Sequence, residues 1–270
     1  MPETPQLKSV TLRTLQQMKS AGEKIACLTC YDASFTRVLE AAGVDMFIIG
    51  DSLGMVLKGH ETTVPVTMAD MIYHGANVAR VGQHALRVVD MPYMSYANPE
   101  QALGNAARLI AEGGADMVKL EGGQDKADIV RHLVSHDIPV CGHIGLLPPS
   151  IEELGGYHVQ GRDEAGARAL LADAQALEAA GATLLVMECI PAELAALITS
   201  SVSMPTIGIG AGPDCDGQVL VLYDMLGITP GRLPRFVRNF LQDTDSVPAA
   251  IRAYVDAVKD ASFPAPEHCF

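Results

Sequence analysis

Short apolar runs alternate along the chain with longer segments of helical apolar spacing, from residue 25 almost to the end. This alternation is the pattern of repeated βα units around a parallel sheet. Eight runs are predicted to be strands: 25–30, 45–50, 86–90, 116–121, 139–143, 183–188, 205–210 and 219–223. The last run is also compatible with a buried helix, because a short apolar stretch does not reveal its own period.

The longer segments carry recognisable helix boundaries. Two examples are 98–113, with Asn98 as the predicted N-cap and Gly114 as the stop, and 163–180, with Asp163 and Gly181 in the same roles. Asn and Asp accept hydrogen bonds from the first free amides of a helix, and Gly adopts the left-handed conformation that ends one.

Eight parallel strands joined by crossover helices close most naturally into an α/β fold of the (β/α)8 TIM-barrel type. An open, doubly wound sheet is the alternative, but no GxGxxG motif follows the first run. Neither a linker nor a low-complexity tract interrupts the chain. We therefore predict one domain over residues 1–270, with a helical segment at about 1–24 and a helical tail at about 240–270.

Two connections exceed the usual length of a βα loop, which is about 2 to 6 residues. They run from Ser52 to about Val66 and from Ile144 to about Arg162, and both contain several glycines. Because they follow strand ends, a barrel would place them over its catalytic face as lids. The alternative is that they are surface insertions or oligomer contacts.

Ionisable or hydrogen-bonding residues appear at the carboxyl ends of five successive predicted strands. They are Asp51 and Ser52, Asp90, Lys119 and Glu121, His143, and Glu188. One strand-end Asp is often only a helix cap, and a lone His is often a satisfied core residue. Five strand ends of this kind converge on one face of a barrel, where such enzymes place their chemistry.

Several carboxylates buried together require a compensating cation. Because no Cys or His cluster has zinc spacing, and the CxxC of Cys27 and Cys30 has no second pair, a hard ion such as Mg²⁺ is favoured. Asp51 and Asp90 are the predicted direct metal ligands, and Glu121 is predicted to complete the shell directly or through water. Lys119 shares a strand face with Glu121 and could contact a substrate carboxylate.

Glu188 ends an apolar strand that is distant from Asp51 around the ring. Apolar surroundings are expected to raise its pKa and make it a useful proton acceptor. The alternative is a carboxylate that stabilises the amino end of the following helix.

Composition narrows the range of partners. A net charge of -13 argues against nucleic acid, which needs a basic face, and means that an anionic substrate requires local positive charge in the site. No apolar run approaches the roughly 20 residues of a membrane span, and the polar first 24 residues do not resemble a signal peptide. Cysteines scattered through apolar runs favour a reduced, cytoplasmic setting.

Ordered motifs from about residue 10 to the closing EHCF resemble the ketopantoate hydroxymethyltransferase family. They are YDASF (31–35), GDSLGM (50–55), GHETTVPVT (59–67), MPYMSY (91–96), MVKLEGG (117–123), PVCGHIGLLP (139–148), VMECIP (186–191) and IGIGAG (207–212). The resemblance implies a barrel related to the phosphoenolpyruvate/pyruvate enzymes, Mg²⁺, 5,10-methylenetetrahydrofolate as donor and 3-methyl-2-oxobutanoate as acceptor. It also implies a homodecamer of two stacked pentamers.

When the roles of the family's residues are carried over motif by motif, the resemblance implies that Asp51 and Asp90 are metal ligands that also contact the substrate. Ser52 and Lys119 would bind the oxo acid, Glu121 would complete the metal shell, and Glu188 would accept the proton. The expected reaction forms 2-dehydropantoate through an enolate that Mg²⁺ stabilises. The nearest alternative is a Mg²⁺-dependent carbon–carbon lyase or aldolase of the same barrel superfamily. A non-catalytic scaffold would have lost at least one strand-end residue, and none is missing.

Overall fold

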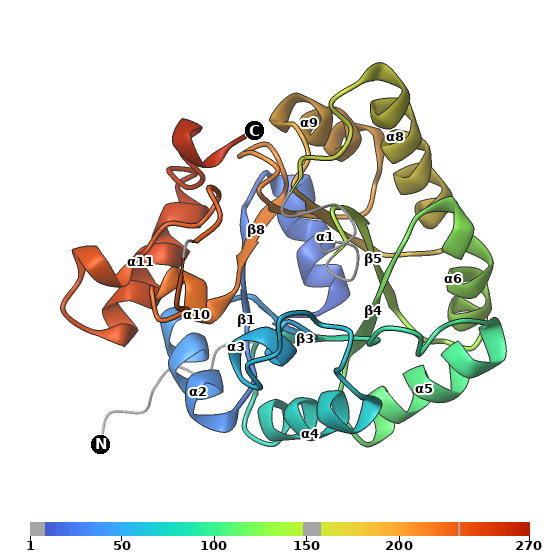
Figure 1. The fold of residues 1–270 in the computed structure, drawn as a ribbon, viewed down its shortest axis with the longest axis horizontal. Helices are drawn as coiled ribbons and strands as arrows, with labels where there is room; N and C mark the ends of the chain where they lie inside the picture. Colours follow the sequence, from blue (N-terminus) through green and yellow to red (C-terminus); the bar gives the residue numbers. More distant parts are fainter. Residues whose placement is uncertain (1–8, 148–157, 232) are drawn as a thin grey trace.

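The computed structural model describes residues 9–147, 158–231 and 233–270. Its eight strands are β1 (Ile25–Thr29), β2 (Met46–Ile49), β3 (Leu86–Asp90), β4 (Met117–Glu121), β5 (Val140–Gly145), β6 (Leu184–Glu188), β7 (Thr206–Ile209) and β8 (Gly217–Leu220). They pair in parallel in chain order, and β1 also pairs with β8. The predicted (β/α)8 barrel is confirmed, and the open sheet is excluded (Figure 1).

Helices surround the barrel, as Figure 1 shows. They are α1 (Leu12–Ala21), α2 (Ala33–Ala42), α3 (Leu53–Val56), α4 (Met68–Ala79), α5 (Pro99–Ala111), α6 (Ala127–Val134), α8 (Glu164–Ala179), α9 (Ala192–Ser201), α10 (Leu222–Met225) and α11 (Val247–Lys259). Short 3-10 turns lie at η1 (Gln124–Lys126), η3 (Leu241–Asp243) and η4 (Pro266–His268). No helix in the described part of the chain is both long and apolar enough to cross a bilayer.

The boundaries predicted for the helices at 98–113 and 163–180 hold to within about two residues. The predicted terminal segments contain shorter helices, α1 within 1–24 and α11 within 240–270. Asn98 caps α5 by accepting from the Gln101 amide, and Asp163 caps α8 by accepting from the Gly166 amide. Gly114 and Gly181 follow these helices with positive φ, as the predicted stops require.

The eighth strand differs from its prediction. The run 219–223 was expected to be extended, but β8 starts earlier, at Gly217, and the chain turns into the short helix α10 after Val221. The early start follows from close packing, because a Cβ on Gly217 would lie 2.4 Å from the Ile25 carbonyl oxygen. The two predicted structures for this run are therefore both present, one after the other.

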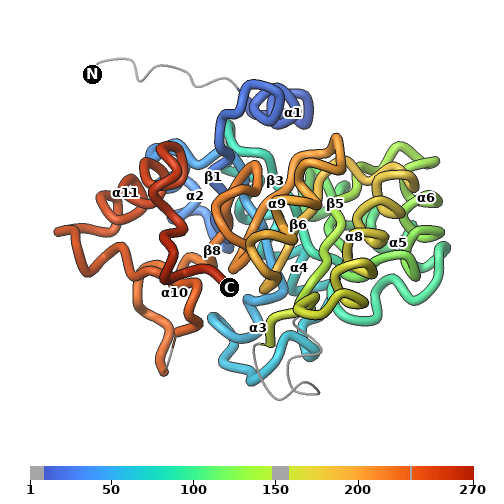
Figure 2. The backbone as a smooth tube through the Cα atoms, turned by 90° about the horizontal axis from the view of Figure 1, so that it is seen from above, coloured from blue at the N-terminus to red at the C-terminus, as the bar shows by residue number. Residues whose placement is uncertain are grey.

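The helix α1 covers the amino-terminal end of the barrel, opposite the end where α3 lies (Figure 2). Leu15 and Met18 are buried beneath it. At its end Lys19 forms an ion pair with Asp216, with Nζ and Oδ2 2.8 Å apart. The amino-terminal end of the barrel is thus covered by α1, which leaves the carboxyl ends of the strands for a site.

The first long connection packs closely against the barrel. It contains α3, and its side chains Leu53, Thr63 and Val66 are buried. The conformation shown is an ordered cover over the carboxyl ends of the strands, and movement as a lid stays a prediction. In the second connection, residues 148–157 lie outside the described residues.

The pairing of β1 with β8, which closes the barrel, is stabilised by a side chain from α11. Tyr254 of α11 is fully buried, and its hydroxyl lies 2.8 Å from the Cys27 carbonyl oxygen in β1 and 2.9 Å from the Gln218 carbonyl oxygen in β8. Phe240 and Phe263 pack edge-on against its ring. One side chain from the C-terminal helix therefore joins the first strand to the last.

Removing this hydroxyl is expected to weaken the closure. Tyr254→Phe should lower the free energy of unfolding by about 1 to 2 kcal/mol, the usual loss for a buried hydrogen bond to a carbonyl. Tyr73→Phe, on an exposed side chain of α4, is the matched control and should leave it unchanged. Chemical denaturation measures both, and equal stability of the two variants would contradict a role for Tyr254 in closure.

Candidate active site

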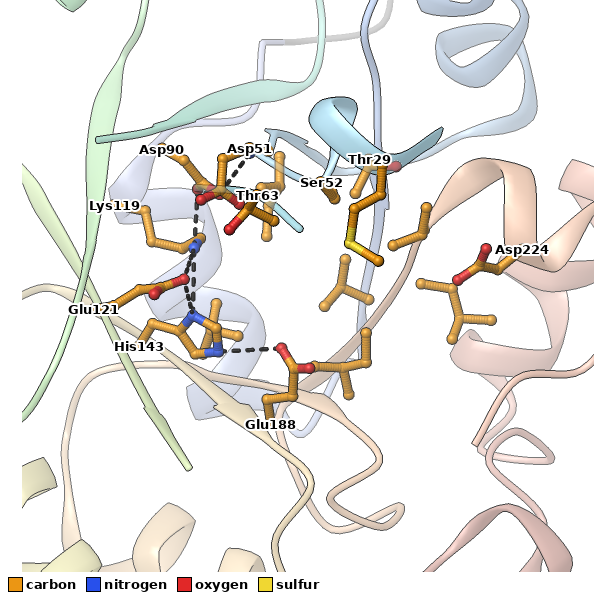
Figure 3. Close-up of a pocket in the computed structure, with 18 of the residues that line it drawn as sticks. Thr29, Asp51, Ser52, Thr63, Asp90, Lys119, Glu121, His143, Glu188 and Asp224 are labelled. Carbon is orange, nitrogen blue, oxygen red and sulfur yellow. Dashed lines mark hydrogen bonds and ion pairs between the residues drawn. The ribbon is translucent and has the colours of Figure 1, made fainter. Parts of the chain in front are cut away.

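All seven predicted site residues, Ser52 included, line one pocket at the carboxyl ends of β2 to β6 (Figure 3). Their side chains are buried, with Ser52 half-buried. Strand register explains the meeting, because Asp90 pairs with Lys119 and Glu121 pairs with His143 across adjacent strands. The pocket contains about 730 Å³ of empty space, including its open mouth.

A continuous chain of charged contacts runs through the pocket. Lys119 Nζ lies 3.0 Å from Asp90 Oδ1 and 3.8 Å from Glu121 Oε1. His143 Nδ1 lies 3.3 Å from Glu121 Oε1, and its Nε2 lies 3.3 Å from Glu188 Oε2. The arrangement alternates acids and bases across four strands, so each charge has an opposite neighbour.

His143 is the centre of this chain. Burial and the nearby Lys119 lower its pKa, but its contacts with Glu121 and Glu188 outweigh them and raise the pKa to about 9. This pKa favours the imidazole as a cation at neutral pH. Its Nδ1 also lies 3.3 Å from Lys119 Nζ, and its Nε2 is close to Glu188 but makes no well-directed hydrogen bond. The setting of Glu188 differs from the apolar one predicted, because a positive ring lies beside it.

The three carboxylates near Lys119 are not equivalent. Burial and the charges of Glu121 and Asp90 raise the pKa of Asp51, and burial raises the pKa of Asp90 although Lys119 opposes it. For Glu121, burial is outweighed by the His143 hydrogen bond and Lys119, which lower its pKa. Asp51 and Asp90 are therefore the pair whose negative charge is least compensated.

This pair fits a hard divalent cation. Asp90 Oδ1 is buried and receives no well-directed hydrogen bond, despite the ion-pair distance to Lys119, so it keeps a lone pair for a ligand. As the side chains lie, no three His, Cys, Asp or Glu in the described ranges are placed to hold a metal together. Two carboxylates that are completed by waters and substrate match the usual Mg²⁺ site. Glu121 is turned to Lys119 and His143, and its place in the metal shell stays a prediction.

Ser52 is held from outside the ion-pair chain. Its Oγ lies 2.9 Å from the Tyr31 hydroxyl, and the Tyr31 carbonyl in turn lies 2.8 Å from His74 Nδ1. Burial raises the pKa of Tyr31, which keeps the phenol neutral and able to donate. The Ser52 hydroxyl is thus fixed at the pocket edge, next to Asp51.

Three polar residues of the pocket were missed by sequence reasoning: Thr29, Thr63 and Asp224. Thr29 ends β1, and its hydroxyl accepts a hydrogen bond from the Leu222 amide at 2.9 Å. Thr63 is buried in the irregular connection after β2, and its hydroxyl has no hydrogen-bond partner among the described residues. No periodicity marks which threonine of such a segment points inward. Asp224 lies at the far side of the pocket. Its position directly after the predicted strand 219–223 was a signal that strand-end reasoning could have used.

Comparison with known proteins gives this site its context. Residues 9–266 match the family described as ketopantoate hydroxymethyltransferase. The chain belongs to this family. A relative from Nitrosococcus oceani, named 3-methyl-2-oxobutanoate hydroxymethyltransferase, is 58% identical over 94% of this chain and 97% of the relative. A second of the same name, from Thiobacillus denitrificans, is 59% identical over 97% of this chain and 99% of the relative.

Solved structures share the fold at much lower identity. A putative phosphonomutase from Burkholderia cenocepacia superposes with a TM-score of 0.62 and 18% identity, over 80% of this chain and 94% of that one. The family membership that the sequence motifs indicated is therefore confirmed by close relatives, and the barrel fold by distant ones.

The charge on His143 is expected to make the stability of the protein depend on pH. Because its pKa in the folded protein lies above the ordinary 6.5, the stabilisation is complete below about pH 6.5 and is lost as the pH rises through about 9. In metal-free protein, we compare the unfolding free energy of the wild type with that of His143→Gln. The advantage of the wild type should be about 3 kcal/mol larger at pH 6 than at pH 9.5. Denaturant titrations at both values test this, and a difference that does not depend on pH would show that His143 is neutral.

Proposed function

We propose that the protein transfers a hydroxymethyl group from 5,10-methylenetetrahydrofolate to 3-methyl-2-oxobutanoate and so forms 2-dehydropantoate. The names of the two close relatives support the substrate and the reaction. The observation that carries the proposal is the buried chain of acids and bases at the barrel mouth, which ends on Glu188. Such a site can hold an anionic oxo acid at one end and remove its proton at the other.

The polar end of the pocket binds the oxo acid. Asp51 and Asp90 would hold Mg²⁺, with Glu121 completing its shell. When bound there, the ion supplies electrostatic stabilisation for the negative charge that develops on the keto oxygen. Lys119 and Ser52 bind the substrate carboxylate, and the charge on Lys119 offsets the repulsion of an anion by an acidic protein.

Glu188 accepts the proton from C3 of the oxo acid. The His143 cation, 3.3 Å from its Oε2, holds the carboxylate in place and is itself held by Glu121. The carbanionic C3 then forms a bond to the methylene carbon of the folate-derived iminium. That carbon leaves the folate nitrogen, water supplies the hydroxyl oxygen, and tetrahydrofolate is released.

Assembly and location follow from the same family resemblance. We include in the proposal a homodecamer of two pentamers and a cytoplasmic location. All six cysteines are free, and five of them are buried, which suits a reducing compartment.

The metal assignment is tested by removing one carboxylate at a time. Asp51→Ala and Asp90→Ala should each weaken Mg²⁺ binding by at least about tenfold in the presence of 3-methyl-2-oxobutanoate, because each removes a charged ligand. Asp256→Ala, on the exposed face of α11, should bind like the wild type. Calorimetry measures the three, and full affinity in both site variants would contradict the assignment.

The reaction itself is tested by omission. Purified protein should form 2-dehydropantoate only when Mg²⁺, 5,10-methylenetetrahydrofolate and 3-methyl-2-oxobutanoate are all present, as measured by chromatography. A lyase or aldolase of the same fold would enolise the oxo acid without consuming the folate donor. Product formation that does not depend on the folate donor would therefore overturn the proposal.

A further inference from the structure

The pocket has a second polar end that the reaction steps described above leave unused. Asp224 of α10 lines the pocket, apart from the ion-pair chain and across the cavity from it (Figure 3). Its half-buried carboxylate forms no ion pair with any Lys, Arg or His in the described ranges. A partly buried carboxylate without a cation beside it is stabilised by each hydrogen-bond donor that it meets, including donors of a ligand.

The Asp224 side chain is held in a fixed orientation. Its Oδ1 accepts a hydrogen bond of 2.5 Å from the Thr229 hydroxyl, and the Gly227 amide donates to the Asp224 carbonyl at 2.9 Å. Burial raises the pKa of Asp224, and the bond from Thr229 partly opposes this. The turn that follows α10 therefore fixes the carboxylate before any ligand arrives.

The walls between the two polar ends are apolar. They include Ile48, Val186, Ile209, Val219, Leu220 and Phe236. A short branched oxo acid, bound through its keto and carboxylate oxygens, fills the polar end beside Asp51 and leaves this slot open. The slot suits a second ligand that is flat, has apolar faces and carries hydrogen-bond donors at its far edge.

The donor in the proposed function has this chemistry. Its reduced pterin is a fused bicyclic ring with an N3–H and a 2-amino group side by side on one edge. Two parallel N–H donors match the two oxygens of a carboxylate, and bidentate bonds of this kind to an ionised group add both energy and geometric specificity. Resting on the proposed function, we infer that Asp224 binds the N3–H and 2-amino edge of the donor heterocycle while the ring lies against the apolar wall.

The inference predicts a specific coupling between one residue and one substituent. The probes are tetrahydrofolate and its 2-deamino-2-methyl analogue, each titrated by calorimetry with Mg²⁺ and 3-methyl-2-oxobutanoate present. Wild-type protein should bind the analogue at least about tenfold more weakly, since a charge-assisted bond is lost. Asp224→Asn should bind both probes with similar, weakened affinity, because the amide cannot accept from both donors.

Two further variants complete the experiment. Asp128→Asn, on an exposed side chain of α6, should discriminate between the probes as the wild type does. Thr229→Val, which frees the carboxylate without removing it, should weaken tetrahydrofolate binding less than Asp224→Asn and keep part of the discrimination. The inference is overturned if Asp224→Asn binds tetrahydrofolate like the wild type, or if it weakens both probes by the same factor. A wild type that binds neither probe would instead overturn the proposed function.

Discussion

Compensation of buried negative charge is the constraint on which the site depends. Four carboxylates and two basic side chains share one end of the pocket, across from Asp224: Asp51, Asp90, Glu121, Glu188, Lys119 and His143. With both bases charged, two negative charges stay uncompensated, and they are concentrated where Asp51 and Asp90 meet. Protons or a divalent cation would stabilise a site of this kind, and such a cation together with Lys119 would attract an acid substrate.

The barrel holds these like charges close together because it fixes the position of each group separately. Each charged residue lies within a buried strand or just beyond its carboxyl end, so strand pairing largely fixes its position. The cover formed by α3 and the Thr63 segment excludes water from one side, which strengthens each charged contact. The opposite side stays apolar and leads to Asp224, so apolar side chains separate the two polar ends of the pocket.

Most of the fold was predictable because its signals are local. Buried strands are short apolar runs, and their last residues project to one face, so Asp51, Asp90 and Glu188 could be identified from sequence. Contacts that depend on how two strands pair could not be predicted from the sequence. The register that pairs Gly145 with Glu188 brings His143 beside that carboxylate, and no pattern within either strand reveals it. The early start of β8 likewise depends on packing of Gly217 against β1, which is a contact between the two ends of the chain.

Proton removal by Glu188 is the central claim, and hydrogen exchange measures it without the carbon–carbon step. With Mg²⁺ in D₂O, wild-type protein should exchange the C3 proton of 3-methyl-2-oxobutanoate, with and without tetrahydrofolate. Glu188→Gln keeps the size of the side chain but cannot accept the proton, so exchange should fall by about 10²- to 10⁴-fold. Glu193→Gln, at an exposed residue of α9, is the matched control and should exchange like the wild type. Exchange by Glu188→Gln at close to the wild-type rate under both conditions would show that another group is the base.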